Sequence, residues 1–302
     1  MTSLGVYRRL QTLSTAEGHF NILAVDHRDA LRAAVDPDDP SSVPDSTLAD
    51  LKMRLVASLG GHASAIMLEP ELSMAQTIAS GVLPPDCGFT AAIEAQGYLA
   101  DPSAATNATL PGWSVEAAAA SGASAAKILV LWDPSDDASQ RAQVDWIEGL
   151  VHDCARVSMP LLLEPIIRKQ VQFDAHLTMI ERMSSLKPDI LKLAIPPGET
   201  RFQLLDQAAL GRPWILLSAG VGFELFAEQV GGACEAGASG FAVGRALWGE
   251  YLHAPADRVE DAVAAMVERL RSLCDTTSAL ATPWTERVAA PRSDARWYLD
   301  RI

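Results

Sequence analysis

The sequence contains few cysteines, and none of them stands in a spacing that is typical of a metal or disulfide motif. Cys87, Cys154, Cys234 and Cys274 are scattered over 302 residues, without a C-x-x-C pair or a Cys/His cluster. The sequence therefore predicts neither a disulfide framework nor a structural zinc site, and this cysteine usage is typical of a protein of the reducing cytoplasm.

Long apolar runs and an excess of positive charge are also missing. No stretch of about 18 residues is apolar throughout, so we expect no membrane span. Arg8 and Arg9 are not followed by an apolar segment, so no signal peptide is predicted. The formal net charge is −14. An acidic chain matches the phosphates of nucleic acids poorly, so we expect no nucleic-acid partner.

What the sequence does contain is a repeated pattern, in which a short apolar run is followed by a stretch of helical periodicity. Near-continuous apolar runs are typical of parallel strands that are buried on both faces. We expect eight such strands, at residues 21–26, 65–69, 88–93, 126–132, 160–164, 190–195, 214–218 and 240–245.

The segments between these runs predict helices and one long loop. The expected helices span 46–58, with Ser46 as N-cap, and 139–157, 224–236 and 257–273. Residues 36–44 are rich in Pro, Asp and Ser and predict a loop after the first strand. We expect the tail, 275–302, to pack on the outside.

Eight alternations over about 250 residues are typical of an α/β fold, the (β/α)8 TIM barrel. A doubly wound open sheet is the alternative. It would favour a glycine-rich fingerprint after the first strand, where Asp26-His27-Arg28-Asp29 stands instead. We therefore predict a single barrel domain over 1–302, with the barrel at about 20–256 and an extra C-terminal helix and tail at 257–302.

Two lysines lie inside apolar strand sequences, Lys127 in AKILVLW and Lys192 in ILKLAI. Burial and a neighbouring cation both disfavour the charged form of an amine, which makes it a better nucleophile. Glu164 ends the intervening strand, where a carboxylate would move protons during Schiff-base chemistry. The alternative for all three residues is a structural ion pair across the barrel.

Active sites of such barrels lie at the C-terminal ends of the strands, and the loops after strands 7 and 8 commonly bind phosphate. Here those loops carry small residues and a fixed cation, which predict a phosphate site made by Ser218, Gly220, Gly244 and Arg245. Asp26 and Glu69 also end predicted strands.

His27 and Arg28 follow the first strand and are candidates to bind sugar hydroxyls or a second anionic group; a solvated loop histidine is the alternative for His27. The other five histidines fall mostly in or beside predicted helices, so we find no set of metal ligands converging at the strand ends. We expect neither a metal nor another cofactor.

These residues resemble the class I tagatose-1,6-bisphosphate aldolases and the related sulfofructosephosphate aldolases. The resemblance covers nearly the whole chain and rests on blocks that recur in order, LAVDHRDAL (23–31), AIMLEPE (65–71), ASAAKILVLWD (123–133), LLLEPIIR (161–168), DILKLAIP (189–196), PWILLSAGV (213–221), AGASGFAVGRALW (236–248) and TPWTE (282–286).

The resemblance implies a role for each matching residue. It implies the Schiff-base lysine at Lys192, the acid/base carboxylate at Glu164, the second active-site lysine at Lys127, a substrate-contacting aspartate at Asp26, and phosphate-binding positions at Ser218 and Arg245. His27 departs from the family, which usually has glutamine there, and Ala194 stands where the family usually has glutamate.

Two branches of the family are matched in different places. Arg168 resembles the sulfosugar branch, whereas TPWTE and residues 97–113 resemble the tagatose branch. Arg168 is therefore a further candidate for substrate binding. The resemblance also favours a homo-oligomer.

The prediction is a cytoplasmic, metal-independent aldolase that reversibly cleaves a phosphorylated ketose to dihydroxyacetone phosphate and a three-carbon aldehyde. The ketose would be of the tagatose-1,6-bisphosphate or 6-deoxy-6-sulfofructose-1-phosphate type. A phosphosugar isomerase or epimerase that uses Glu164 as base is one alternative. A non-catalytic sugar-phosphate binding protein is another, motivated by His27 and Ala194.

Overall fold

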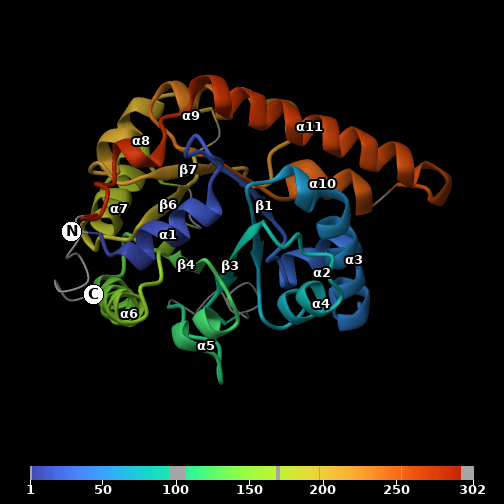
Figure 1. The fold of residues 1–302 in the computed structure, drawn as a ribbon, viewed down its shortest axis with the longest axis horizontal. Coiled ribbons are helices and arrows are strands. Elements are labelled where there is room, and N and C mark those ends of the chain that lie inside the picture. The colour runs from blue at the N-terminus through green and yellow to red at the C-terminus, as the bar shows by residue number, and fades with distance from the viewer. Residues whose placement is uncertain (1, 96–105, 168–170, 197, 253, 294–302) are drawn as a thin grey trace.

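The computed structural model describes residues 2–95, 106–167, 171–196, 198–252 and 254–293. Eight parallel strands form a closed barrel in chain order, and helices surround it (Figure 1). The barrel closes where β8 pairs with β1, with Val243 beside Leu23. The strands are β1 (Phe20–Ala24), β2 (Ala65–Leu68), β3 (Gly88–Ala92), β4 (Ala125–Leu131), β5 (Leu161–Ile166), β6 (Ile190–Leu193), β7 (Trp214–Leu217) and β8 (Gly240–Val243). The predicted (β/α)8 barrel is confirmed.

Helices precede, connect and follow the strands. They are α1 (Leu4–Leu13), α2 (Asp29–Val35), α3 (Asp45–Leu59), α4 (Met74–Ala79), α5 (Val115–Ala120), α6 (Asp137–Arg156), α7 (Phe173–Ser185), α8 (Phe202–Ala208), α9 (Phe223–Glu235), α10 (Arg245–Leu252) and α11 (Val259–Leu280). Short 3-10 turns occur at Pro40–Ser42, Gly60–His62, Ala256–Arg258 and Trp284–Glu286. The long α11 runs across the outside of the barrel beside α9 and α10 (Figure 1).

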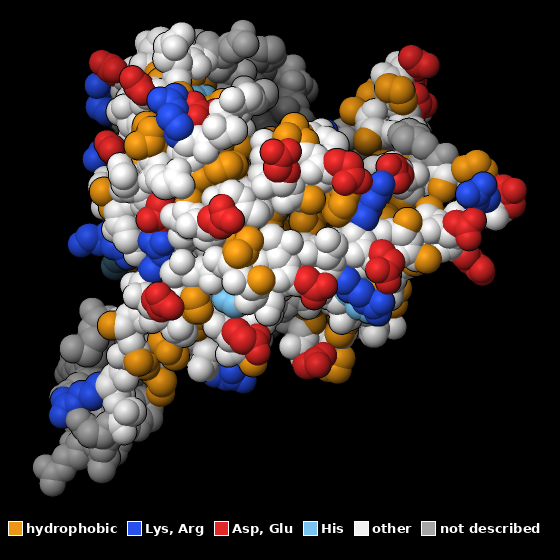
Figure 2. Space-filling model, turned by 90° about the horizontal axis from the view of Figure 1, so that it is seen from above, with side chains coloured by type: hydrophobic (Ala, Val, Ile, Leu, Met, Phe, Trp, Pro, Cys, Tyr) orange, Lys and Arg blue, Asp and Glu red, His pale blue; other side chains and the backbone are white. Residues whose placement is uncertain are grey.

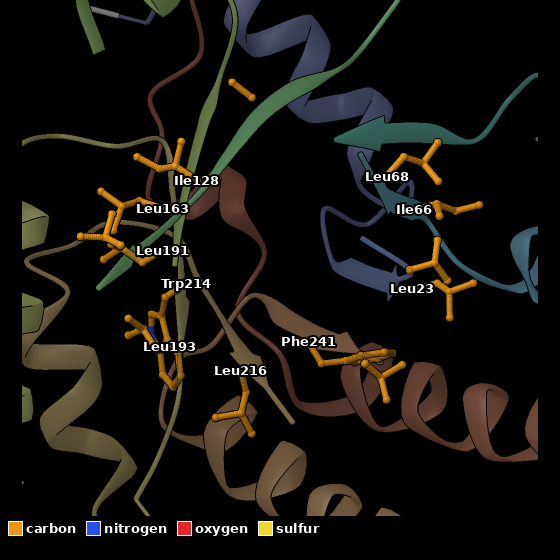
Figure 3. Packing of buried hydrophobic residues seen from close by; sticks show 14 of the residues in the cluster. Leu23, Ile66, Leu68, Ile128, Leu163, Leu191, Leu193, Trp214, Leu216 and Phe241 are labelled. Carbon is orange, nitrogen blue, oxygen red and sulfur yellow. The ribbon is translucent and has the colours of Figure 1, made fainter. Parts of the chain in front are cut away.

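The strands are apolar on both faces because each face is buried against a different layer. Outward-facing side chains pack with helix residues in one large cluster, part of which Figure 3 shows, including Leu23, Ile66, Ile128, Leu163, Leu191, Leu216 and Phe241. Inward-facing side chains such as Ile22, Met67 and Ile215 form a second cluster inside the barrel. This double burial explains why the strands appear in the sequence as continuous apolar runs.

The N-terminal end of the barrel is closed by two segments from opposite ends of the chain. The indole of Trp284 lies 4.8 Å from the ring of Tyr7 in α1 and 6.4 Å from that of Phe20 in β1, measured between centroids. Its N–H donates to Ser14 Oγ at 2.9 Å. Trp284 is 1% exposed. The prediction that the tail packs on the outside is wrong for this residue, because its indole fills the floor of the barrel.

Two helix starts differ from the prediction because other residues precede the first turn. Pro44, not Ser46, stands immediately before α3, so Ser46 lies inside the first turn rather than at the N-cap. In α6 the side chain of Asp136 accepts the backbone N–H groups of Ala138 and Ser139, both at 3.0 Å. This cap starts α6 two residues earlier than predicted, at Asp137 instead of Ser139.

The segment after the barrel and the one after β1 also differ in detail. Helix α11 begins at Val259 and continues to Leu280, because no glycine or proline interrupts the chain before Pro283. The predicted loop at 36–44 contains only a 3-10 turn, but the unpredicted α2 lies between it and β1.

The surface reflects the acidic composition. Figure 2 shows Asp and Glu side chains scattered over one face of the molecule, with Lys and Arg side chains between them. Within the described ranges, the structure has no helix whose length and apolar character would let it cross a bilayer.

Candidate active site

Three charged side chains point into the C-terminal half of the barrel from consecutive strands. They are Lys127 on β4, Glu164 on β5 and Lys192 on β6. Successive residues of a strand face opposite sides, and the preceding or following residues of these strands belong to the outward-facing cluster, namely Ile128, Leu163 and Leu191. The alternation of the three strands therefore brings the charged groups together inside the barrel.

The two lysines share one carboxylate but differ in how many others they contact. Lys192 Nζ donates to Glu164 Oε2 at 2.9 Å, and Lys127 Nζ lies 3.2 Å from the same oxygen. Lys127 Nζ also lies 3.0 Å from Asp26 Oδ2 and 2.9 Å from Glu94 Oε1. All five side chains are buried. Lys127 is thus an ion-paired cation deep in the cluster.

The lysines determine the ionisation of the carboxylates beside them. Burial opposes charge on Glu164, but the ammonium groups of Lys192 and Lys127 outweigh it and hold the pKa of the Glu164 carboxyl below its usual value. Burial also acts against charge on Asp26, and the same two lysines overcome it and hold the pKa of Asp26 far below its usual value. Both carboxylates are therefore ionised at neutral pH and are able to accept protons.

A cavity of about 300 Å³ opens above this cluster at the C-terminal end of the barrel. Lys192 and Glu164 form part of its lining. Its polar wall comes from the ends of β7, β8 and β1, and comprises His27, Ser218, Gly220, Gly244 and Arg245. Its opposite wall is apolar and includes Leu129, Leu131 and Ile166. Lys192, Glu164 and the predicted phosphate-binding residues therefore face one cavity, whereas Lys127 and Asp26 are not among its described lining residues.

The polar wall has the features of an anion site. Arg245 is the first residue of α10 and directly follows β8 and Gly244, so its guanidinium stands beside the N-terminus of a helix. Gly220 has a left-handed backbone with φ of 81°, and a Cβ there would lie 3.3 Å from Arg245 Nη2. Glycine at this position therefore allows the loop after β7 to approach the cation closely. Backbone N–H groups and a guanidinium together suit a phosphate.

His27 forms the edge of the cavity between the lysine cluster and the anion site. Its ring packs edge-on against Trp248, with 5.3 Å between centroids, and lies over Gly244. Burial, reinforced by the positive charges of Lys192 and Arg245, lowers the pKa of His27 to about 4, although Asp26 opposes this. The imidazole is neutral at pH 7, and its Nδ1 has no hydrogen-bond partner among the described residues.

Arg28 is not among the described residues that line this cavity, whereas the preceding residue, His27, is. Its guanidinium is 4% exposed and donates to Glu71 Oε2 at 2.5 Å and to the backbone carbonyl of Glu94 at 3.0 Å. The structure thus places Arg28 behind the cluster, beside the segment that carries Glu94, rather than at the position expected for a substrate contact.

Glu69, the other polar residue that follows a strand, belongs to a separate ion pair. Its Oε1 accepts a hydrogen bond from Lys52 Nζ in α3 at 2.5 Å, and neither side chain has measurable exposure. Its Oε2 accepts the backbone N–H groups of Glu71 and Leu72. Every contact of Glu69 joins elements of the scaffold, so the residue is structural.

The sequence pattern missed Glu94, although a signal for it exists. Glu94 directly follows the apolar run of β3 and shares the inward parity of Ala92, which pairs with Lys127. Asp26 and Glu164 were identified because a polar residue ends an apolar strand sequence, and the same criterion applies to Glu94. Ala194 is half-buried after β6. Arg168 lies outside the described residues.

A larger groove of about 720 Å³ lies between α6 and α7, where Arg141, Glu148 and Arg182 line it. We assign the active site to the smaller cavity, because its described lining, unlike that of the groove, includes the buried ion pair of Lys192 and Glu164 at the strand ends. In the part of the chain that the structure describes, no three His, Cys, Asp or Glu side chains are arranged to hold a metal ion.

Comparison with known proteins agrees with this geometry. A family model described as DeoC/LacD family aldolase matches residues 20–250. A tagatose 1,6-diphosphate aldolase 2 from Enterococcus faecalis is 29% identical, and the alignment covers 92% of this chain and 95% of that protein. A tagatose 1,6-diphosphate aldolase from Staphylococcus aureus is 27% identical, with 92% and 97% covered.

Solved structures share the barrel at lower identity. An archaeal fructose 1,6-bisphosphate aldolase superposes with a TM-score of 0.64 at 19% identity, covering 91% of this chain and 99% of that one. A Schiff base-forming fructose-1,6-bisphosphate aldolase gives 0.63 at 20% identity, covering 90% and 99%. At this identity the structures establish the fold, and the family model establishes the rest: the chain belongs to the DeoC/LacD family of aldolases and is a carbon–carbon lyase.

Proposed function

We propose that this aldolase works through a Schiff base on Lys192 and cleaves a phosphorylated ketose to dihydroxyacetone phosphate and a three-carbon aldehyde. One observation carries the proposal: Lys192 Nζ stands 2.9 Å from an ionised carboxylate, Glu164, and both border a cavity whose far wall holds Arg245. Relatives named tagatose 1,6-diphosphate aldolases support the substrate class.

The first step forms the covalent intermediate. Lys192 passes a proton to Glu164, and its neutral amine attacks the ketone carbon C2 of the substrate. A proton moves from nitrogen to the former carbonyl oxygen, which gives a carbinolamine. Glu164 then returns its proton to the hydroxyl group, water leaves, and an iminium remains. The 2.9 Å separation suits each of these transfers.

The second step breaks the carbon–carbon bond. The Glu164 carboxylate accepts the proton of the C4 hydroxyl, C4 becomes the carbonyl of the departing aldehyde, and the electron pair of the C3–C4 bond forms an enamine with the iminium. Glu164 then protonates C3, and water hydrolyses the restored iminium, which releases dihydroxyacetone phosphate and regenerates Lys192 as an ammonium beside the Glu164 carboxylate. Asp26 assists by holding a substrate hydroxyl beside Glu164.

The polar wall would bind the phosphate on C1. Arg245 supplies charge, Ser218 supplies a hydroxyl, and Gly220 and Gly244 let backbone N–H groups approach. The neutral imidazole of His27 would contact a sugar hydroxyl, and Arg168 remains our candidate for the acidic group at the far end of the ketose, either a phosphate or a sulfonate.

Borohydride trapping tests the proposal. The protein is incubated with dihydroxyacetone phosphate and borohydride, and the adduct is located by intact mass and peptide mapping. We expect one stable adduct on Lys192. Lys192→Met should abolish this adduct and lower turnover by at least about a thousandfold. The exposed Lys187 precedes β6, at the end of the barrel opposite the cavity, and provides a control. Lys187→Met should keep both the adduct on Lys192 and the turnover.

An adduct on a different lysine would refute the assignment of Lys192. The absence of any adduct, with binding of dihydroxyacetone phosphate measured separately, would refute the covalent mechanism.

A further inference from the structure

Lys127 has an unusual concentration of negative charge around it. Three carboxylates lie within 3.2 Å of its Nζ atom, at 3.0 Å for Asp26, 2.9 Å for Glu94 and 3.2 Å for Glu164. They come from the ends of β1 and β3 and from β5, so they approach the ammonium from different sides. By comparison, the structure pairs Lys192 with Glu164 and Lys52 with Glu69.

This arrangement strongly favours the protonated form of Lys127. An ammonium has three N–H donors, and three carboxylates are placed to accept them. Lys127 is 3% exposed and Glu94 is 1% exposed, so water does little to stabilise charge at either group. Loss of the proton would leave three buried carboxylates facing a neutral amine, and uncompensated buried charge is costly.

The proposed reaction would disturb this balance in every turnover. When Glu164 takes a proton from Lys192 or from the substrate, it becomes neutral and ceases to be a counter-ion for Lys127. The two carboxylates that remain are Asp26, which we expect to contact substrate, and Glu94. Neither carboxylate is among the described residues that line the cavity, and Glu94 is the more deeply buried of the two, at 1% exposed against 8% for Asp26.

Glu94 is itself held in place from behind. Its backbone carbonyl accepts a hydrogen bond from Arg28 Nη2 at 3.0 Å, and the same nitrogen lies 3.9 Å from Glu94 Oε1. Arg28 is anchored in turn by Glu71 at 2.5 Å. These contacts fix the carboxylate of Glu94 against Lys127, which explains why a buried arginine stands next to the active site without reaching the cavity.

We propose that Glu94 is a positioning residue that keeps Lys127 protonated throughout turnover, so that Lys192 alone supplies the neutral amine. The inference rests on the proposed Schiff-base function, because it explains how one of two neighbouring lysines is selected as the nucleophile. Among the described residues, the charged groups that act on Lys127 include Asp26, Glu94 and Glu164, with Lys192 and Arg28 one contact further away.

The small number of lysines makes the ionisation of Lys127 directly measurable. The chain has five, Lys52, Lys127, Lys169, Lys187 and Lys192. A protein labelled with [ε-13C]lysine therefore gives five NMR signals, which single Lys→Arg variants assign. We expect the Lys127 signal of the wild type to remain that of an ammonium up to a pH of about 10.

Two variants of Glu94 separate its charge from its volume. Glu94→Gln removes the charge and keeps the shape, and should lower the titration midpoint of Lys127 by about one pH unit or more, a tenfold change in its ionisation equilibrium. Glu94→Asp keeps the charge and should preserve the wild-type midpoint. Glu148→Gln removes an exposed carboxylate on α6, outside this chain of contacts, and serves as a control that should leave the Lys127 midpoint unchanged.

The pH profile of borohydride trapping on Lys192 gives a second readout. In Glu94→Gln the decrease in trapping at high pH should occur at a lower pH, by a similar amount. If Glu94 were purely structural, its substitution would lower the melting temperature and leave this decrease at the wild-type pH. The inference is overturned if Lys127 of the wild type titrates near or below a pH of about 8, or if Glu94→Gln keeps the wild-type midpoint.

If Glu94→Gln fails to fold, the wild-type titration can still overturn the inference, because a neutral Lys127 at a pH of about 8 would contradict it. A wild type that forms no adduct on Lys192, while Lys127 stays protonated, would refute the proposed function but support the ion pairing of Lys127. If Glu94→Gln forms the normal adduct on Lys192 and keeps the wild-type titration midpoint of Lys127, this inference is refuted and the proposed function is not.

Discussion

The imidazole of His27 lies over Gly244 so closely that a Cβ at position 244 would stand 2.7 Å from its Cε1 atom. Gly244→Ala should therefore displace the imidazole and destabilise the protein by about 1–3 kcal/mol, as other overpacked sites do. Urea unfolding measures this change, and substrate saturation curves should show a higher KM. In a His27→Ala background the same substitution should be less costly, because the ring is gone. Equal effects in both backgrounds would contradict this contact.

His27 should make the fold sensitive to acid. The pKa of His27 is about 4 in the folded protein, against about 6.5 for an unfolded histidine. As the pH falls through this interval, the unfolded state binds a proton that the folded state does not. The free energy of unfolding should therefore decrease between pH 6.5 and 4, by up to about 3 kcal/mol.

Urea unfolding at several pH values in that interval tests this. His27→Gln should flatten the decrease, whereas substitution of the exposed His152 should not. A His27→Gln protein as acid-sensitive as the wild type would exclude His27 as the cause.

Substitution of Lys52 should lower the stability of the fold without lowering turnover, unlike substitution of the buried Lys192. Lys52→Met leaves Glu69 buried without its counter-ion, and we expect a loss of about 3–5 kcal/mol of stability. Lys52→Met/Glu69→Gln should recover much of it, because a glutamine oxygen still accepts the N–H groups of Glu71 and Leu72. Turnover per folded molecule should be unchanged in both. A folded Lys52→Met protein without activity would show that this pair serves the reaction.

Arg245 should contribute to affinity for the phosphate and little to the covalent chemistry. Arg245→Met removes the guanidinium beside Gly220, and the KM of a phosphorylated ketose should rise about 10- to 100-fold, the equivalent of one or two charged hydrogen bonds. Trapping of dihydroxyacetone, which has no phosphate, should be nearly unaffected. A parallel loss with both compounds would mean that Arg245 does not act on the phosphate.

The barrel and its reactive cluster were predictable because both follow from strand alternation. Runs such as ILKLAI are apolar on both faces, and a lysine within such a run points to one side of the sheet. Lys127, Glu164 and Lys192 therefore met inside the barrel as expected. The same logic would have found Glu94.

Contacts between segments that lack a repeating pattern were not predictable in this way. Arg28 follows a strand as a substrate-binding residue would, but it pairs with Glu71 and with the segment at Glu94. Lys52 lies within a predicted helix, where a lysine is usually solvated, yet it is buried against Glu69. In each case the partner is brought close by tertiary packing, which local periodicity does not encode.

The floor of the barrel has a consequence for how the chain is made. Its indole, Trp284, comes from the last turn of the described chain, whereas Tyr7 and Phe20, against which it packs, come from the first helix and first strand. All eight strands and α11 precede Trp284 in the chain, so they are synthesised before Trp284 can close the floor. During translation Phe20 therefore lacks its contact with Trp284, and the N-terminal end of the barrel closes only after all eight strands have been synthesised.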